Sequence, residues 1–275
     1  MTYCVGVLVE QGLVLIADTR TNAGLDDIST YRKLTTISVP GERILALASA
    51  GNLALSQSVL GLLTEGLRND ETGEAETLQT VPTLFQAALL IGRAIRRVRA
   101  MEQAALEQAD LRFDVTFLFG GQISGGPMEL YLFYSAGNFI RCGPDAPFLQ
   151  IGEHKYGKPI LDRAVRYNTE LYEALKIGLI SMDSTMRSNI GVGLPIDLAI
   201  AQRDALAFEV LHRIEPGEPY FHDLSERWSA ALRAAHKSIP RPPYGQEPLG
   251  GPHELERRVS SNGRQLKPID DQPPR

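Results

Sequence analysis

The feature that most constrains the fold is the way the hydrophobic period changes along the chain. Short apolar runs bounded by turn residues, which are typical of strands, give way to longer runs whose apolar residues recur at helical spacing. Strands come first, two helices follow, and strands, helices and strands complete the series. This order favours two sheets inside and helices outside, because a doubly wound fold needs single strands and helices that alternate. We therefore expect a layered α+β fold.

The expected elements can be placed by residue number. A helix is expected from Asn52, its possible N-cap, to about residue 67. Two further helical segments are expected at about 82–108 and 161–182. The expected strands are residues 3–9, 13–18, 34–39, 44–50, 113–120, 128–135, 196–202 and 206–214.

The composition shifts near Glu215, and this shift suggests a domain boundary. Residues 1–214 are expected to form the main domain, and residues 215–239 a helical extension with one amphipathic helix at about 224–236. Residues 240–275 are rich in Pro, Gly and charge, so we expect an extended or disordered tail there.

Charge and motif content argue against several classes of function. The net charge of -5 and the pI of about 5.6 provide no basic field for binding phosphates, so nucleic acid is not an expected partner. None of the 5 histidines stands in a recognisable metal-site motif, and the glycine-rich nucleotide-binding motifs are missing from the sequence. We expect no metal and no cofactor.

The N-terminal sequence and the cysteines bear on location. Residues 1–18 lack the basic start and the cleavage pattern of a signal peptide, so the mature protein is expected to begin at residue 1 or 2. No stretch approaches the roughly 18 uninterrupted apolar residues of a membrane helix. Cys4 and Cys142 form no C-x-x-C pair, which fits a reducing compartment. We expect a cytoplasmic protein with no membrane partner.

A candidate catalytic set lies in the first part of the chain: Thr2, Asp18, Lys33 and Gly51. An N-terminal threonine carries its own base, because its α-amine has a reference pKa of about 7.7–8.0. The Lys33 ammonium would disfavour protonation of this amine, and the Asp18 carboxylate would keep Lys33 charged and in place. The backbone N–H of Gly51, before a helix, is suited to face an oxyanion. This chemistry requires that Met1 be removed, and the small second residue permits its removal.

These residues and the element order resemble the proteasome β-subunit family. The matching stretches are Met1-Thr2 before a hairpin, IADTRTNAG (16–24), YRKL (31–34) and SAGNLA (49–54), and the likeness covers about residues 2–214. The MTYCVG start, with no propeptide, and the long C-terminal extension are most similar to the bacterial ancestral β-subunit group called Anbu.

The resemblance implies a fold, an activity and an assembly. The implied fold is the four-layer αββα sandwich of the N-terminal nucleophile hydrolases. The implied activity is that of a threonine peptidase or amidohydrolase, which cleaves a peptide or other amide substrate through an acyl-enzyme on Thr2. The implied partner is the chain itself, in a ring or open ring-like homo-oligomer.

Further residues carry over from the family along the chain. The family's late Asp and Ser correspond to Asp183 and Ser188, although Ser184 competes for the serine role. Where the family has a serine flanked by glycines, this chain has Glu153 in QIGEHKYG. An acidic side chain at that place could hold the amine protonated and lower activity. The resemblance also assigns the substrate pocket to Thr21, Tyr31, Ser49 and Leu53.

Other interpretations stay open on the sequence alone. Asp18 could be a turn carboxylate at the surface, and Lys33 a solvated lysine. Cys4 lies among apolar residues and is more typical of a buried small side chain than of a nucleophile. The chain could also be a self-assembling scaffold of the same fold with little activity, or an amidase that acts on small molecules.

Overall fold

A computed structural model describes residues 1–22, 28–69, 73–242 and 244 of the chain. The chain divides into two units, residues 1–225 and residues 226–275. The division falls inside the last helix, α5 (Pro219–Ser238), and thus after the expected domain end at residue 214. The expected tail, residues 240–275, lies almost entirely outside the described residues.

The first sheet is built around the N-terminal hairpin. Every residue of its first two strands is buried, which explains why both strands read as nearly continuous apolar runs. They pair antiparallel with Cys4 opposite Ala17, so Asp18 ends its strand next to the start of the chain. In spatial order the sheet contains β12 (Phe148–Gly152), β1 (Tyr3–Leu8), β2 (Gly12–Asp18), β13 (Ile196–Gln202) and β14 (Val210–Ile214).

The second sheet is also antiparallel and also has five strands. Its long central strands pair in a register that places Gly51 opposite Val115. In spatial order the sheet contains β11 (Phe139–Arg141), β10 (Glu129–Phe133), β9 (Val115–Ile123), β6 (Arg43–Gly51) and β5 (Leu34–Val39). Two short hairpins lie outside the sheets: β3 (Arg20–Asn22) with β4 (Ile28–Thr30), and β7 (Leu67–Arg68) with β8 (Ala75–Glu76).

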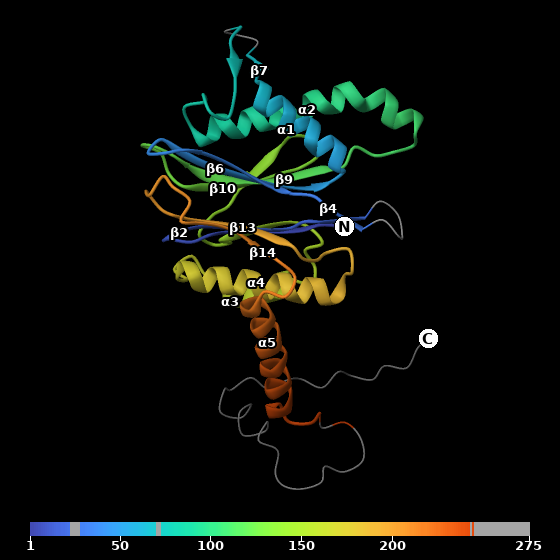
Figure 1. Cartoon of the computed structure of the whole chain (residues 1–275), viewed down its shortest axis with the longest axis vertical. Coiled ribbons are helices and arrows are strands. Elements are labelled where there is room, and N and C mark those ends of the chain that lie inside the picture. Colours follow the sequence, from blue (N-terminus) through green and yellow to red (C-terminus); the bar gives the residue numbers. More distant parts are fainter. Residues whose placement is uncertain (23–27, 70–72, 243, 245–275) are drawn as a thin grey trace, which may run out of the picture. The chain divides into compact units, whose positions relative to one another are not determined.

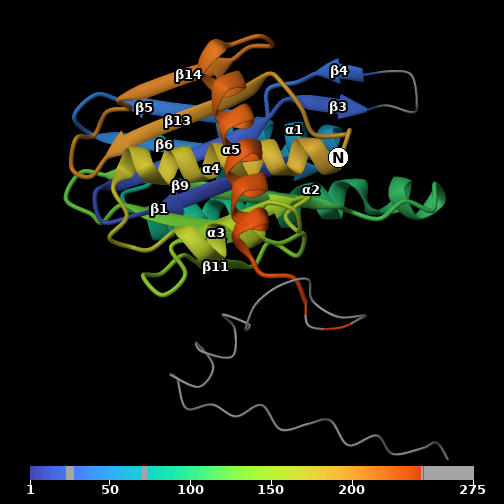
Figure 2. The same cartoon turned by 90° about the horizontal axis from the view of Figure 1, so that it is seen from below.

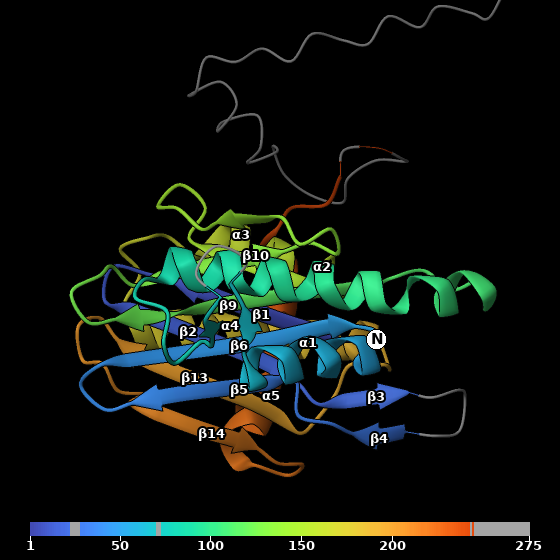
Figure 3. The ribbon, with the colours of Figure 1, turned by 90° about the horizontal axis from the view of Figure 1, so that it is seen from above.

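Helices cover the outer face of each sheet and complete four layers (Figure 1). Helices α1 (Leu53–Glu65) and α2 (Leu84–Gln108) lie on the second sheet (Figure 3), and α3 (Lys158–Ala164) and α4 (Leu171–Ser188) lie on the first (Figure 2). The expected αββα sandwich is confirmed.

Side-chain alternation explains why the sheets stack. In β6, Leu45 and Leu47 belong to the core under α1 and α2, whereas Ile44, Ala46 and Ala48 belong to the core between the sheets. Period-two alternation therefore lets one strand contribute to two apolar layers. The small side chains of Ala46 and Ala48 on the inner face allow the two sheets to approach each other.

The expected helix at 161–182 is wrong in one respect, because it is two helices. The chain leaves α3 at Val165 in an extended conformation. Thr169 Oγ1 then accepts a hydrogen bond of 2.8 Å from the N–H of Arg166, and Glu170 caps α4 by accepting one of 2.9 Å from the N–H of Glu173. These local side-chain bonds compete with helix continuation. The N-cap expected at Asn52 is confirmed, because its side chain accepts from the N–H of Leu55.

Other differences concern strands. The expected strand 206–214 begins only at Val210, because Leu206 has a φ of +48° and cannot extend the strand. The strands β11 and β12 and the two short hairpins were not expected. Over the described residues, no helix combines the length and the apolar character needed to cross a membrane.

Candidate active site

The N-terminal hairpin fixes an aspartate beside the first residues of the chain. Thr2 immediately precedes β1 and is half-buried, and Met1 is exposed. Asp18 ends β2, and its Oδ1 accepts a hydrogen bond of 2.9 Å from the backbone N–H of Tyr3. The aspartate is therefore anchored to the residue that follows Thr2.

Lys33 forms a buried ion pair with this aspartate. The two side chains are 5% and 0% exposed, and Lys33 Nζ lies 2.9 Å from Asp18 Oδ1. The same ammonium lies 2.6 Å from the backbone oxygen of Arg20 and 3.5 Å from that of Met1. Lys33 therefore approaches the peptide group that joins Met1 to Thr2.

Burial dominates the electrostatics of the Asp18 carboxyl. Burial raises the pKa of the Asp18 carboxyl, and the Lys33 ammonium together with the N–H groups of Tyr3 and Gly193 opposes the rise. Ionisable pairs of this kind, removed from solvent, are concentrated at functional sites. The two residues that the sequence predicted as partners are thus brought together by the fold.

Gly51 lies at the point where β6 passes into α1. Its φ of +101° lies in the region that favours glycine, and an added Cβ would be 2.4 Å from the backbone oxygen of Asp114. Backbone N–H groups alternate in direction along a strand, and the N–H of Ser49 donates to the backbone oxygen of Lys33 at 3.1 Å. The N–H of Gly51 therefore points to the side of β6 on which Lys33 lies.

The residues expected from the late helix are placed differently. The two carboxylate oxygens of Asp183 accept hydrogen bonds from Arg187 Nε at 3.2 Å and from Ser225 Oγ at 2.7 Å. Ser188 ends α4 and is exposed, and Ser184 is half-buried. Within the described part of the chain, no hydrogen bond or ion pair joins these three residues to the buried pair. A catalytic role for Asp183 thus gains no support, because its helix position directs the carboxylate to Arg187 and Ser225.

Glu153 is held against the N-terminal segment. Its backbone N–H donates to the backbone oxygen of Thr2 at 2.7 Å. Its side chain accepts a hydrogen bond of 2.8 Å from Asn189 Nδ2 and lies 3.2 Å from Lys155 Nζ. Asn189 was not among the residues predicted from the sequence. The signal that could have found it is the Asn-Ile-Gly turn sequence at 189–191, directly after the helix.

The residues expected to bind substrate lie near the same strand ends. Thr21 is on β3, and Leu53 is the half-buried first residue of α1. Tyr31 is 45% exposed and its N–H donates to the backbone oxygen of Thr19 at 2.8 Å. Ser49 is buried. The side chains of Thr21, Tyr31 and Leu53 are therefore at least partly accessible, whereas Ser49 is buried and its N–H is bound to the backbone oxygen of Lys33.

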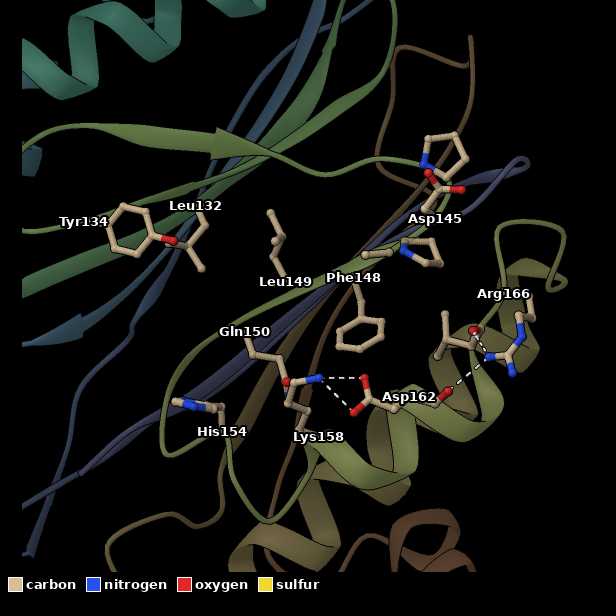
Figure 4. Close-up of a pocket in the computed structure, with 14 residues that line it drawn as sticks. Leu132, Tyr134, Asp145, Phe148, Leu149, Gln150, His154, Lys158, Asp162 and Arg166 are labelled. Atoms are coloured by element: carbon tan, nitrogen blue, oxygen red, sulfur yellow. Dashed lines mark hydrogen bonds and ion pairs between the residues drawn. The ribbon is translucent and has the colours of Figure 1, made fainter.

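A cavity of about 630 Å³ lies elsewhere, between β10, β12 and α3 (Figure 4). Phe148 and Leu149 line it together with Leu132, and the ion pair of Lys158 with Asp162 lies at its border. None of the predicted catalytic or substrate-binding residues lines it. Among the described residues, no group of three or more His, Cys, Asp or Glu could hold a metal ion.

Comparison with known proteins connects this geometry to a family. No family model and no curated protein matches the chain. An Anbu (Gly-1) mutant from Hyphomicrobium sp. strain MC1 is 46% identical, and the alignment covers 89% of this chain and 100% of that chain with a TM-score of 0.81. Anbu (ancestral beta-subunit) from Yersinia bercovieri is 41% identical over 89% of this chain and 100% of that chain, with a TM-score of 0.80.

A third solved structure extends this likeness. The helical assembly of the Anbu complex from Pseudomonas aeruginosa is 44% identical, with a TM-score of 0.82 over 89% of this chain and 100% of that chain. The resemblance inferred from the N-terminal motifs is therefore confirmed, and the sandwich is of the N-terminal nucleophile hydrolase type. This chain belongs to the Anbu family of proteasome β-like subunits.

Proposed function

We propose that this protein is a threonine peptidase or amidohydrolase that cleaves amides through an acyl-enzyme on Thr2, after removal of Met1. The supporting observation is the buried pair of Lys33 and Asp18, whose ammonium lies 3.5 Å from the backbone oxygen of Met1. A buried ion pair is a weak source of stability, because desolvation offsets the attraction. Its position at the N-terminus is better explained by chemistry on Thr2.

The proposed reaction uses the α-amine of Thr2 as its base. The Lys33 ammonium disfavours protonation of the amine, and Asp18 holds Lys33 in place at 2.9 Å. The amine takes the proton of the Thr2 hydroxyl as Oγ attacks the carbonyl carbon, and the N–H of Gly51 donates to the oxyanion. The protonated amine then passes the proton to the departing nitrogen, and an ester remains on Oγ. Water hydrolyses this ester and restores the hydroxyl.

The remaining predicted residues are proposed to have supporting roles. Thr21, Tyr31, Ser49 and Leu53 are proposed to line the substrate pocket. Ser188 is proposed as a hydrogen-bonding group near the amine, because it directly precedes the Asn189 that contacts Glu153. We assign Asp183 a structural role instead, through Arg187 and Ser225.

We propose that the chain acts as a homo-oligomer in the cytoplasm. The related Anbu complex from Pseudomonas aeruginosa forms a helical assembly. Contacts between different surfaces of identical subunits close into a ring or continue as a helix, depending on the rotation between neighbours. The two cysteines Cys4 and Cys142 are free thiols, which suits a reducing compartment.

A second candidate function is a self-assembling scaffold with little hydrolytic activity. The observation that favours it is the placement of Glu153. Its side chain is only 12% exposed, and its backbone N–H donates a hydrogen bond to the backbone oxygen of Thr2. A carboxylate beside the amine stabilises the ammonium form, and an ammonium cannot accept the hydroxyl proton.

A threonine variant separates the two candidates. Wild type, Thr2→Ala and the control Thr64→Ala, at an exposed position of α1, are compared for assembly by sedimentation velocity and for hydrolysis of a panel of peptides and short amides. Assembly should survive in all three proteins under either function. Turnover that is lost only in Thr2→Ala supports the hydrolase. Turnover that Thr2→Ala retains would contradict Thr2 as the nucleophile, and no turnover in wild type would support the scaffold instead.

A further inference from the structure

The loop after β12 holds the chain at Thr2 by a close backbone contact. Gly152 has a φ of +78°, and an added Cβ would lie 2.0 Å from the backbone oxygen of Thr2. Glycine therefore permits an approach that any other residue would obstruct. The next residue, Glu153, donates its N–H to the same oxygen at 2.7 Å. The position of Glu153 relative to Thr2 is thus fixed by the backbone.

Asn189 fixes the side chain of Glu153. Its Nδ2 donates to Glu153 Oε2 at 2.8 Å, and its Oδ1 accepts from the N–H of Gly191 at 2.9 Å. An amide has a donor end and an acceptor end, and here each end has the partner that it requires. One side chain therefore links the carboxylate of Glu153 to the loop that follows α4.

The same loop packs against Met1. An added Cβ at Gly191 would lie 2.6 Å from Met1 Cβ, so the loop and the first residue are in close contact. Met1 therefore lies between this loop and Lys33, whose Nζ is 3.5 Å from the Met1 backbone oxygen. Removal of Met1 therefore frees an α-amine at Thr2 near Lys33 and near the loop whose Asn189 holds the Glu153 carboxylate.

The other charged groups around the N-terminus are already engaged or exposed. Asp18 of β2 is paired with Lys33. Arg20 of β3 donates to the backbone oxygen of Ile190 at 2.8 Å.

Lys155, after β12, is 64% exposed, so solvent screens its charge. On α4, Arg187 is bound to Asp183. Glu153 is therefore the carboxylate near Thr2 that has no buried cation as its partner in the described chain.

We infer that Glu153 stabilises the ammonium form of the Thr2 amine and that Asn189 is the positioning residue that holds Glu153 there. The inference rests on the proposed function and deepens it, because it identifies what controls the base. Lys33 and Glu153 then act in opposite senses on one amine. The pH at which Thr2 becomes nucleophilic reports the balance between them.

Periodate oxidation provides a test that needs no hydrolase activity. Periodate cleaves an N-terminal threonine between the carbons that bear its amine and its hydroxyl, and it reacts with the unprotonated amine. The full chain beginning at Thr2 is prepared from a fusion cleaved before Thr2, and the rate of oxidation is followed by intact mass across pH. The midpoint of this profile gives the pKa of the amine. A chain that fails to turn over substrates still gives a midpoint, so the two proposals fail separately.

A double-mutant cycle should show that Glu153 and Asn189 act on the amine through one shared interaction. Glu153→Gln should lower the midpoint by about 1 pH unit, because it removes an opposite charge near the amine. Asn189→Ala should lower it by a smaller amount, and should lower it no further in the Glu153→Gln background. The control Asp162→Asn removes an exposed carboxylate on α3 and should leave the midpoint unchanged.

Three results would overturn the inference. An unchanged midpoint in Glu153→Gln would remove the role of the carboxylate. Equal shifts by Asn189→Ala with and without the Glu153 carboxylate would show that Asn189 acts on the structure in general. A shift in Asp162→Asn as large as that in Glu153→Gln would show that total charge, and not position, sets the midpoint. Thermal melts of each variant verify that the folded protein is compared.

Discussion

Replacing Lys33 by alanine should leave Asp18 as a buried carboxylate without a cation. The Asp18 side chain is 0% exposed, and Lys33 supplies its charge partner at 2.9 Å. Removal of one member of a buried pair typically costs about 3–5 kcal/mol of folding free energy, because the remaining charge stays desolvated. We expect a loss of this size at pH 8.

The loss should depend on pH in a defined direction. Burial already raises the pKa of the Asp18 carboxyl, and without Lys33 the pKa should rise further. The folded state then binds the proton more tightly than the unfolded chain, whose aspartate has a pKa of about 3.9. The stabilisation that protonated Asp18 gives the folded variant is therefore complete below the unfolded pKa of about 3.9, and it is lost as pH rises through the pKa of Asp18 in the folded state. Each pKa unit of difference corresponds to about 1.4 kcal/mol, so Lys33→Ala should be less destabilised at pH 5 than at pH 8.

Urea unfolding at pH 5 and pH 8 measures this effect. Wild type, Lys33→Ala and the double variant Asp18→Asn with Lys33→Ala are compared, together with Lys176→Ala. Lys176 forms an exposed pair with Glu173, and its removal should cost no more than about 1 kcal/mol. The double variant should lose the extra pH dependence. The reasoning is refuted if Lys33→Ala costs no more than Lys176→Ala, or if its cost is equal at the two pH values.

Other predictions follow from single contacts. Gly152→Ala should destabilise the protein by more than Gly41→Ala in urea unfolding. The two glycines have similar φ, +78° and +72°, but only at Gly152 would an added Cβ lie within 4 Å of the Thr2 backbone. Equal losses of stability in the two variants would contradict this reasoning. Asp183→Asn should lower the urea midpoint but leave the rate of Thr2 modification by an electrophile unchanged, and a lost modification would restore its catalytic assignment. Burial raises the pKa of the Cys142 thiol to about 12, so iodoacetamide should label it at pH 8 only after unfolding, as mass spectrometry can show. Labelling of the folded protein would contradict its burial.

The layered fold was predictable because the spacing of apolar residues distinguishes strands from helices along most of the chain. The strands β1 and β2 are uninterrupted apolar runs, and α2 has an apolar stripe over many turns. β12 was missed because its sequence, FLQIG, is short and does not alternate clearly, and its pairing with β1 depends on contacts distant in sequence. The break between α3 and α4 was missed because the capping bonds of Thr169 and Glu170 are local details within an otherwise helical pattern.

The site was predictable where strand ends determine position. Asp18 ends β2 and Lys33 directly precedes β5, and these strands belong to different sheets, so the stacking of the two sheets brings the residues together. Asp183 lies on a helix, where each residue turns the side chain by about 100°, so the sequence alone did not show that its carboxylate contacts Arg187 and Ser225. Asn189 contacts Glu153 across two loops, and no periodic signal marks such a contact.

The most direct test of the central claim is the intact mass of the protein before and after treatment with an epoxyketone, which requires both a hydroxyl and a free α-amine on one residue. The expected mass lacks Met1 and increases by a single adduct, and Thr2→Ala forms no adduct. A retained Met1, or no adduct on a protein that begins at Thr2, would contradict the assignment of Thr2 as the nucleophile.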